Sequence, residues 1–248
     1  MRNLKAVILA AGMGLRLRPR TQKVPKGFLE VDGKTLLERS FLALKQAGIA
    51  EVVIVVGYLH EMIQTRLGDN FLGMPIRYVY NEEYATSGSM NSFLKAKAVI
   101  GDSAVLLLES DLLYDAKCID LALCSPYRDV MLVSPLSGSG DEVYVCADQR
   151  NQIRALGKQL SDDQKRQACG EMMGISRFSA DFLKHLFKTA EDDYARGEYL
   201  YHYEECVIRA TTAALPVYIL PTDLQWIEID REEDLKRARE IIYPLMVK

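Results

Sequence analysis

The feature that most constrains the fold is an alternation of short apolar runs with amphipathic segments. The runs Leu4–Leu9, Glu51–Val56 and Ala104–Leu108 are predominantly aliphatic, as are strands buried on both faces of a parallel sheet. Thr35–Ala47 instead repeats its apolar residues at helical spacing. Strands that alternate with helices predict right-handed crossovers, and hence an α/β fold with a doubly wound, mostly parallel sheet. Further helices are expected at Glu61–Leu67 and Ser89–Val99, and a further strand at Ile76–Tyr80.

The alternation loosens beyond Asp115. Strands are expected at Val130–Ser134 and Met172–Phe178, with a short antiparallel pair, Glu142–Cys146 and Gln152–Gly157, between them. We interpret this part as a small inserted substrate lobe, approximately residues 136–178, within a single domain that spans residues 1–248. The remaining expected elements are helices at Ala180–Ala190, Tyr199–Thr211 and Arg231–Ile242 and a strand at Val217–Leu220.

Composition excludes several classes of protein. With 49% hydrophobic and 26% charged residues, the 248-residue chain matches average soluble domains and differs from disordered or membrane-embedded chains. A formal net charge of −3 gives no overall attraction to nucleic acid or anionic lipid, so any anion site must be local. The five cysteines are scattered and odd in number, which favours neither a disulfide framework nor a zinc ribbon. The reducing cytoplasm is therefore the expected compartment.

A local anion site is predicted directly after the first strand. Five basic and no acidic residues lie between Arg16 and Lys26, and Gly12-x-Gly14 precedes them. Glycines let backbone N–H groups approach phosphate oxygens and the cations neutralise charge, so this basic loop is typical of a polyphosphate clamp. The alternative is a solvated loop, which the glycines and the buried strand disfavour.

Two familiar phosphate motifs do not fit this region. Leu17 stands where the dinucleotide-binding fingerprint has its third glycine. Gly33-Lys34-Thr35 opens a helix as a P-loop does, but Phe28 stands where a Walker A motif needs glycine. A P-loop kinase is therefore not expected.

Two further segments carry carboxylates at predicted strand ends. Leu106–Asp111 reads LLLESD, and Trp226–Asp230 reads WIEID, in which alternation puts Glu228 and Asp230 on one face. Open α/β sheets bind ligands beyond the carboxyl ends of their strands, and hard carboxylate oxygens suit Mg²⁺. Asp111 is the better metal candidate of the first segment. Helix capping is the alternative for Asp230, which precedes a predicted helix.

The pattern L-A-A-G-x-G-x-R, completed by Pro25-Lys26, resembles the signature of the nucleoside-triphosphate transferases, or nucleotidyltransferases. The resemblance implies that Arg16 and Lys26 act in catalysis at the phosphates and that Asp111 and Asp230 bind one Mg²⁺. Ser87-Gly88-Ser89 would lie flat against the base, although the Ser89 hydroxyl is also suited to cap the next helix. The implied nucleotide-binding residues are Leu9, Ala10, Ala11, Gly12, Gly14, Arg16, Lys26, Ser87, Gly88, Ser89 and Asp111.

Within this family the segments NEEYATSGSMN, LLLESDLLYD and SGSGDEV look most like the cytidylyltransferases of aminoethylphosphonate and phosphocholine. That resemblance implies CTP and a small phosphonate or phosphate-ester acceptor as substrates, and Lys158 as a further catalytic lysine between acceptor and α-phosphate. A primary ammonium needs carboxylates, whereas a quaternary ammonium is best held by an aromatic cage. We therefore assign Asp141, Glu142 and Glu204 to the acceptor's amine. A solvated hairpin tip is the alternative for the first two, and a surface position for Lys158.

Several alternatives stay open at this stage. Phosphocholine is the competing acceptor, and a catalytically inactive nucleotide-sensing subunit is the competing class of protein. The chain has both implied catalytic cations and both implied metal carboxylates, which argues against an inactive subunit. These residues are Arg16, Lys26, Asp111 and Asp230. Neither nucleic acid nor membrane is an expected partner, and the sequence decides neither the choice between CTP and UTP nor whether the chain forms a homo-oligomer.

Overall fold

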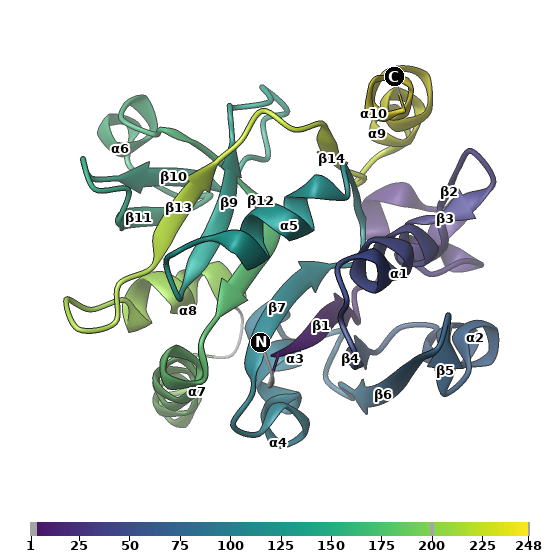
Figure 1. The fold of residues 1–248 in the computed structure, drawn as a ribbon, viewed down its shortest axis with the longest axis horizontal. Coiled ribbons are helices and arrows are strands. Elements are labelled where there is room, and N and C mark those ends of the chain that lie inside the picture. Colours follow the sequence, from purple (N-terminus) through teal and green to yellow (C-terminus); the bar gives the residue numbers. More distant parts are fainter. Residues whose placement is uncertain (1–3, 199–200, 248) are drawn as a thin grey trace.

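The computed structural model describes residues 4–198 and 201–247. Four parallel strands form the middle of its main sheet, in the order β7, β1, β4 and β6 (Figure 1). Their bounds are β1 Leu4–Ala10, β4 Val52–Val56, β6 Met74–Tyr80 and β7 Ala104–Glu109. All four match predicted strands, and the parallel pairing confirms the predicted fold class. A two-residue strand, β5 (Asn70–Phe71), pairs with β6 at the edge of the sheet.

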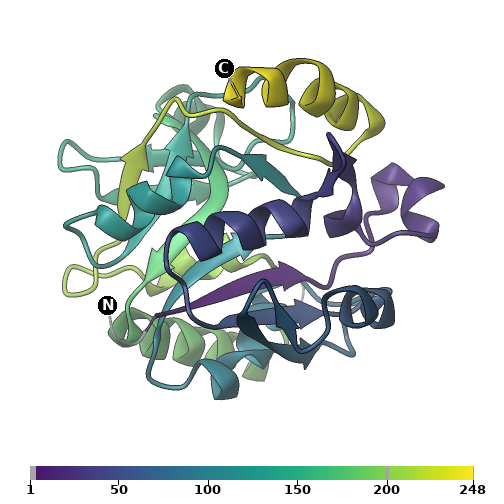
Figure 2. The same cartoon turned by 45° about the vertical axis from the view of Figure 1, so that its right-hand side comes forward.

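Helices cover both faces of this sheet, because side chains alternate between two cores along each strand. On β1, Ala6 and Ile8 face one core, whereas Val7 and Leu9 face the other. The first core is covered by α1 (Leu36–Gln46), α2 (His60–Leu67) and α5 (Lys117–Cys124). The second is covered by α3 (Ser89–Lys95), α7 (Ala180–Ala195) and α8 (Tyr203–Ala210). Figure 2 shows α1 lying across one side of the sheet and α7 on the other.

The second half of the chain extends the same sheet with antiparallel strands. The long strand β12 (Gly170–Phe178) pairs with β7, with β9 (Val130–Ser134) and with β10 (Tyr144–Ala147). β11 (Ile153–Gly157) pairs with β10, and β13 (Tyr218–Pro221) runs parallel to β9. Because β12 pairs directly with β7, the predicted lobe is continuous with the central sheet.

Some elements differ from the sequence prediction. The helix expected at Ser89–Val99 is divided at Ala96 into α3 and α4 (Lys97–Ile100). The helix expected at Tyr199–Thr211 begins at Tyr203, and positions 199 and 200 lie outside the described residues. The last helix continues as α9 (Glu232–Arg237), a π-helical turn at Ala238–Ile242 and α10 (Tyr243–Met246). The sequence did not predict α5, α6 (Asp162–Arg166), β5 or the hairpin of β2 (Glu30–Val31) with β3 (Lys34–Thr35).

A separate two-stranded sheet, also not predicted, completes the fold. β8 (Leu112–Tyr114) pairs antiparallel with β14 (Trp226–Glu228), and thereby joins the segment after β7 to the C-terminal part of the chain. Glu228 pairs with Leu112 in this register, and the backbone N–H of Ile229 donates to the carbonyl oxygen of Asp111 at 3.0 Å. Across residues 4–198 and 201–247, no helix is both long enough and apolar enough for a membrane crossing.

Candidate active site

A cleft of about 590 Å³ opens at the carboxyl ends of β1 and β7. Open α/β sheets bind ligands at this edge. The basic loop after β1 lines one part of the cleft, and the acidic segments at the ends of β7 and β14 line another. The antiparallel part of the sheet contributes Ser134 with the loop between β9 and β10, Lys158 directly after β11, and residues 171–174 of β12. The cleft therefore adjoins both halves of the main sheet.

The basic loop is shaped by its two glycines. Gly14 adopts a left-handed backbone conformation with φ 58°, and its carbonyl oxygen accepts a 2.7 Å hydrogen bond from the Thr21 hydroxyl. Gly12 lines the cleft, and a Cβ there would meet no atom within 4 Å. The space beside the Gly12 backbone is therefore open, and its predicted role in binding phosphate stays a prediction.

The cations of the loop pair with carboxylates of distant segments. Lys26 donates to Asp111 and to Asp230, and Arg16 donates to Asp230 and to Asp141. Burial opposes the charge of the Lys26 ammonium, but Asp111 and Asp230 outweigh burial and raise the pKa of Lys26 above its usual value. Lys26 therefore keeps its positive charge at neutral pH.

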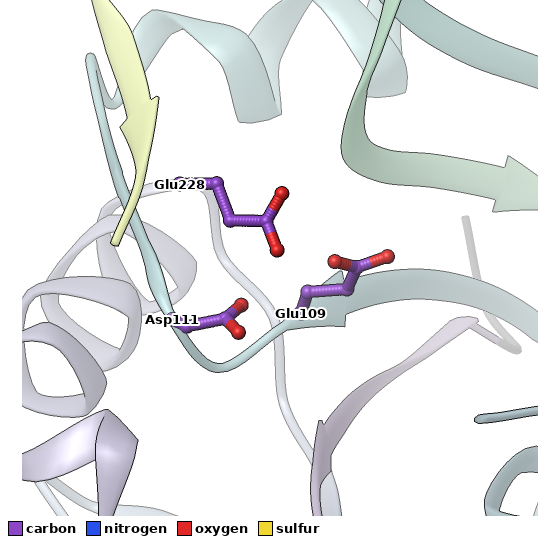
Figure 3. A group of neighbouring side chains, drawn as sticks. All are labelled: Glu109, Asp111 and Glu228. Carbon is purple, nitrogen blue, oxygen red and sulfur yellow. The ribbon is translucent and has the colours of Figure 1, made fainter. Parts of the chain in front are cut away.

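Three carboxylates beside Lys26 form an acidic triad of Glu109, Asp111 and Glu228, shown in Figure 3. One oxygen from each lies within 4.8 Å of the others, and the three side chains turn toward a common space. Burial and the charge of Asp111 raise the pKa of Glu109 to about 8. Burial and the charges of Asp111 and Glu109 raise the pKa of Glu228 well above its usual value. Asp111 Oδ1 is buried and has no hydrogen-bond partner among the described residues. Crowded, unsatisfied carboxylate oxygens fit a small divalent cation such as Mg²⁺.

The two predicted metal ligands therefore differ in their surroundings. Asp111 belongs to the triad, whereas the Asp230 carboxylate is engaged by Lys26 and Arg16. Asp230 does not cap the following helix with its side chain, since its backbone N–H donates to Asp234 and Arg231 occupies the N-cap position. Neither Glu109 nor Glu228 was predicted as a metal ligand from the sequence. The alternation of WIEID, which places Glu228 on the face of Asp230, was the available signal.

The segment predicted to face the base lies between β6 and the start of α3, and it packs against the residues at the start of α8. A Cβ on Gly88 would lie 1.9 Å from the carbonyl oxygen of Tyr201, so only glycine fits there. The Ser89 hydroxyl accepts a 3.0 Å hydrogen bond from the backbone N–H of Tyr203, the first residue of α8. Ser89 thus caps a helix, but a different helix from the expected one. Ser87, Gly88 and Ser89 all line the cleft.

The predicted acceptor residues also line the cleft, in different electrostatic settings. Asp141 is paired with Arg16 at 2.5 Å and with Lys158 at 3.0 Å. Glu142 and Glu204 are only 6% and 5% exposed, which does not match a solvated hairpin tip for Glu142. Burial raises the pKa of Glu204. Their roles toward an acceptor stay predictions.

Comparison with known proteins places the chain in a family. The family described as "MobA-like NTP transferase domain" matches residues 6–174, which include the basic loop and the end of β7. The chain belongs to this family. It is a nucleotidyltransferase, and it is 28% identical over 246 residues to the "Choline-phosphate cytidylyltransferase" of Streptococcus pneumoniae, covering 96% of this chain and 98% of that protein. It is 30% identical over 232 residues to the "2-aminoethylphosphonate cytidylyltransferase" of Lancefieldella rimae, covering 93% and 89% respectively.

Solved structures agree with the fold. The inositol-1-phosphate CTP transferase from T. maritima superposes with a TM-score of 0.81 at 23% identity, covering 98% of this chain and 95% of that one. The CTP:phosphocholine cytidylyltransferase from Streptococcus pneumoniae gives a TM-score of 0.74 at 23% identity, with 96% and 99% covered. Both share the architecture of this nucleotidyltransferase.

Proposed function

We propose that this nucleotidyltransferase transfers CMP from CTP to 2-aminoethylphosphonate and releases pyrophosphate. The observation that carries the proposal is the cleft itself, in which Lys26 lies between two carboxylates and Lys158 joins the network through Asp141. Such a site can align two anionic substrates and neutralise their charge. The names of the two relatives described above support CTP as donor and a small zwitterionic acceptor.

The reaction needs alignment and charge neutralisation more than proton transfer. A phosphonate oxygen of the acceptor forms a bond to the α-phosphorus of CTP. The bond from that phosphorus to the bridging oxygen breaks, and the electron pair leaves with pyrophosphate. The attacking oxygen is already anionic, so no general base is required. We assign Lys26 and Arg16 to the charge that develops on the α-phosphate and the leaving group, and Lys158 to the acceptor oxygens.

The acidic triad would hold the metal in this proposal. Glu109, Asp111 and Glu228 are the residues that would bind Mg²⁺, which when bound neutralises triphosphate charge and orients its oxygens. Asp230 instead positions Lys26 and Arg16, because its two carboxylate oxygens accept hydrogen bonds from them. The Mg²⁺ assignment thus keeps Asp111 from the sequence analysis and adds two neighbours.

The aromatic content of the cleft bears on the choice of acceptor. Among the described residues that line it, Tyr84 and Trp226 are the only Tyr, Trp or Phe side chains, and Tyr84 packs against Gly57. A quaternary ammonium prefers a cage of several aromatic rings, and the cleft offers two. Buried carboxylates, in contrast, are available to a primary ammonium. This difference favours aminoethylphosphonate over phosphocholine.

The test is pyrophosphate release measured with CTP, UTP, ATP and GTP against 2-aminoethylphosphonate, phosphoethanolamine and phosphocholine. We expect the highest kcat/KM for CTP with 2-aminoethylphosphonate. A higher kcat/KM with phosphocholine would show that phosphocholine is the preferred acceptor. A higher value with UTP would show that UTP is the preferred donor. Nucleotide binding without pyrophosphate release from any pair would instead support the inactive nucleotide-sensing subunit.

A further inference from the structure

Glu171 is a cleft residue whose carboxylate is incompletely paired. It lies on β12 and is only 3% exposed. Its Oε2 accepts a 3.1 Å hydrogen bond from the Ser137 hydroxyl, but its Oε1 is buried without a hydrogen-bond partner among the described residues. A buried carboxylate oxygen left without a donor is costly, and such a group in a cleft suggests a ligand that donates.

A second carboxylate increases the negative charge beside Glu171. Glu142 is 6% exposed, lines the same cleft and accepts from the Tyr144 hydroxyl at 3.4 Å. Burial, with the charge of Glu142, raises the pKa of Glu171 to about 6, while Ser137 and the charge of Arg237 act in the opposite direction. Among the described residues no Lys or Arg forms an ion pair with Glu171 or Glu142. At neutral pH this end of the cleft therefore carries negative charge that no ion pair compensates.

The position of Glu171 suits one end of a short zwitterion. Tyr144 on β10 pairs with Glu171 on one side and with Gly157 on the other, and Lys158 follows Gly157 directly. Two strand spacings, about 10 Å between backbones, thus separate Glu171 from the lysine end of β11. Both side chains line the cleft. An acceptor with an anionic and a cationic end can lie between them.

We propose that Glu171, with Glu142 beside it, forms the subsite that binds the ammonium group of the acceptor. The inference rests on the proposed function and specifies its acceptor as a molecule with N–H donors on its cation. A quaternary ammonium has no hydrogen to donate to Glu171 Oε1, whereas a primary ammonium has three. Asp141 is a poorer candidate, because Arg16 and Lys158 already neutralise it.

The experiment compares two acceptors that differ only in the amine, 2-aminoethylphosphonate and ethylphosphonate. Glu171→Gln keeps the size of the side chain and an acceptor for Ser137, and Glu61→Gln, at an exposed position on α2 outside the cleft, is the matched control. We expect Glu171→Gln to raise the KM for 2-aminoethylphosphonate at least about tenfold, because an ammonium loses its charged partner. The KM for CTP and the kcat/KM for ethylphosphonate should stay within about twofold of wild type. Should Glu171→Gln not fold, as judged by thermal unfolding, Glu142→Gln should shift the same KM in the same direction.

Equal losses with both acceptors would overturn the subsite. If the wild type releases no pyrophosphate with any acceptor, the proposed function fails, and calorimetric titration with 2-aminoethylphosphonate in the presence of α,β-methylene-CTP then decides the inference. Binding that Glu171→Gln weakens at least about tenfold supports the subsite. No binding, or equal binding by both proteins, overturns it.

Discussion

Lys26 connects the basic loop to the acidic end of β7, because its ammonium lies between the carboxylates of Asp111 and Asp230. We expect Lys26→Ala to lower kcat by roughly 10²–10³, the loss typical of removing one preorganised charge from a transition state. Lys23→Ala is the matched control, since Lys23 belongs to the same loop but is exposed and does not line the cleft. Steady-state pyrophosphate release with thermal unfolding of each variant makes the comparison. Near-normal kcat in Lys26→Ala would remove Lys26 from the chemistry.

The proposed metal site gives different roles to Glu228 and Asp230, which lie two residues apart at the end of β14. Glu228 belongs to the triad, whereas Asp230 is bonded to Lys26 and Arg16. We expect Glu228→Gln to raise the Mg²⁺ concentration for half-maximal activity at least about tenfold. Because both carboxylates would hold the same ion, the double variant with Asp111→Asn should lose less activity than the product of the two single losses. Asp230→Asn should lower kcat with a smaller change in Mg²⁺ dependence. Calorimetric Mn²⁺ binding to each variant provides a readout independent of activity. The opposite pattern would return the metal to the pair Asp111 and Asp230 that the sequence predicted.

The raised pKa of Glu171 predicts how stability depends on pH. Its value of about 6, against 4.5 for an ordinary glutamate, means that the folded protein holds this proton more tightly than the unfolded chain. The contribution of Glu171 to the free energy of unfolding is therefore complete below about pH 4.5 and is lost as the pH rises through about 6. Glu171→Gln cannot ionise, so its Tm relative to wild type should increase between pH 5 and pH 7.5. A Tm difference that does not change with pH would show that folding does not raise the pKa of Glu171.

Two glycines of the cleft are expected to have different roles, Gly88 in the packing of helices and Gly12 in the binding of ligand. Gly88 brings the start of α3 against the residues before α8, where a Cβ would lie 1.9 Å from the Tyr201 carbonyl oxygen, whereas a Cβ on Gly12 meets nothing within 4 Å. We expect Gly88→Ala to cost about 2 kcal/mol through overpacking, and so to lower Tm by roughly 4–8 °C. Gly12→Ala should leave Tm unchanged and raise the KM for CTP. Calorimetric unfolding and CTP titration compare the two, and similar Tm values for both variants would contradict this division.

Local sequence patterns predicted the elements better than they predicted the pairing between distant elements. The parallel strands and α1 follow from apolar runs and helical spacing, because each pattern lies within one segment. Glu228 reaches Asp111 only because β14 pairs with β8, and three-residue strands carry little signal of their own. Glu171 could not be selected either. That its Oε1 has no hydrogen-bond partner among the described residues depends on where β9, β10 and β12 place their neighbours, which no spacing in the sequence reveals.

At the scale of the whole molecule, the cleft adjoins the parallel and antiparallel halves of one continuous ten-stranded sheet. β7 pairs with β1 on one side and with β12 on the other, so the two halves share a hydrogen-bonded strand. Strands that share a ladder and two cores should unfold together. The net charge of −3 also means that attraction for CTP depends on the local cations of the basic loop and not on the molecule as a whole.

Ligand binding should therefore stabilise the entire chain in one step. CTP with Mg²⁺ at about 100 times its Kd adds ~2.7 kcal/mol to the free energy of unfolding, because it binds the folded state alone. For a chain of this size, that corresponds to a rise in Tm of roughly 5–10 °C. Differential scanning calorimetry should show a single transition that shifts as a whole, with a smaller shift for Lys26→Ala at the same CTP concentration, since that variant lacks a cation of the cleft. Two transitions, of which only one moves with CTP, would instead divide the chain into a nucleotide-binding unit and a separately folded lobe.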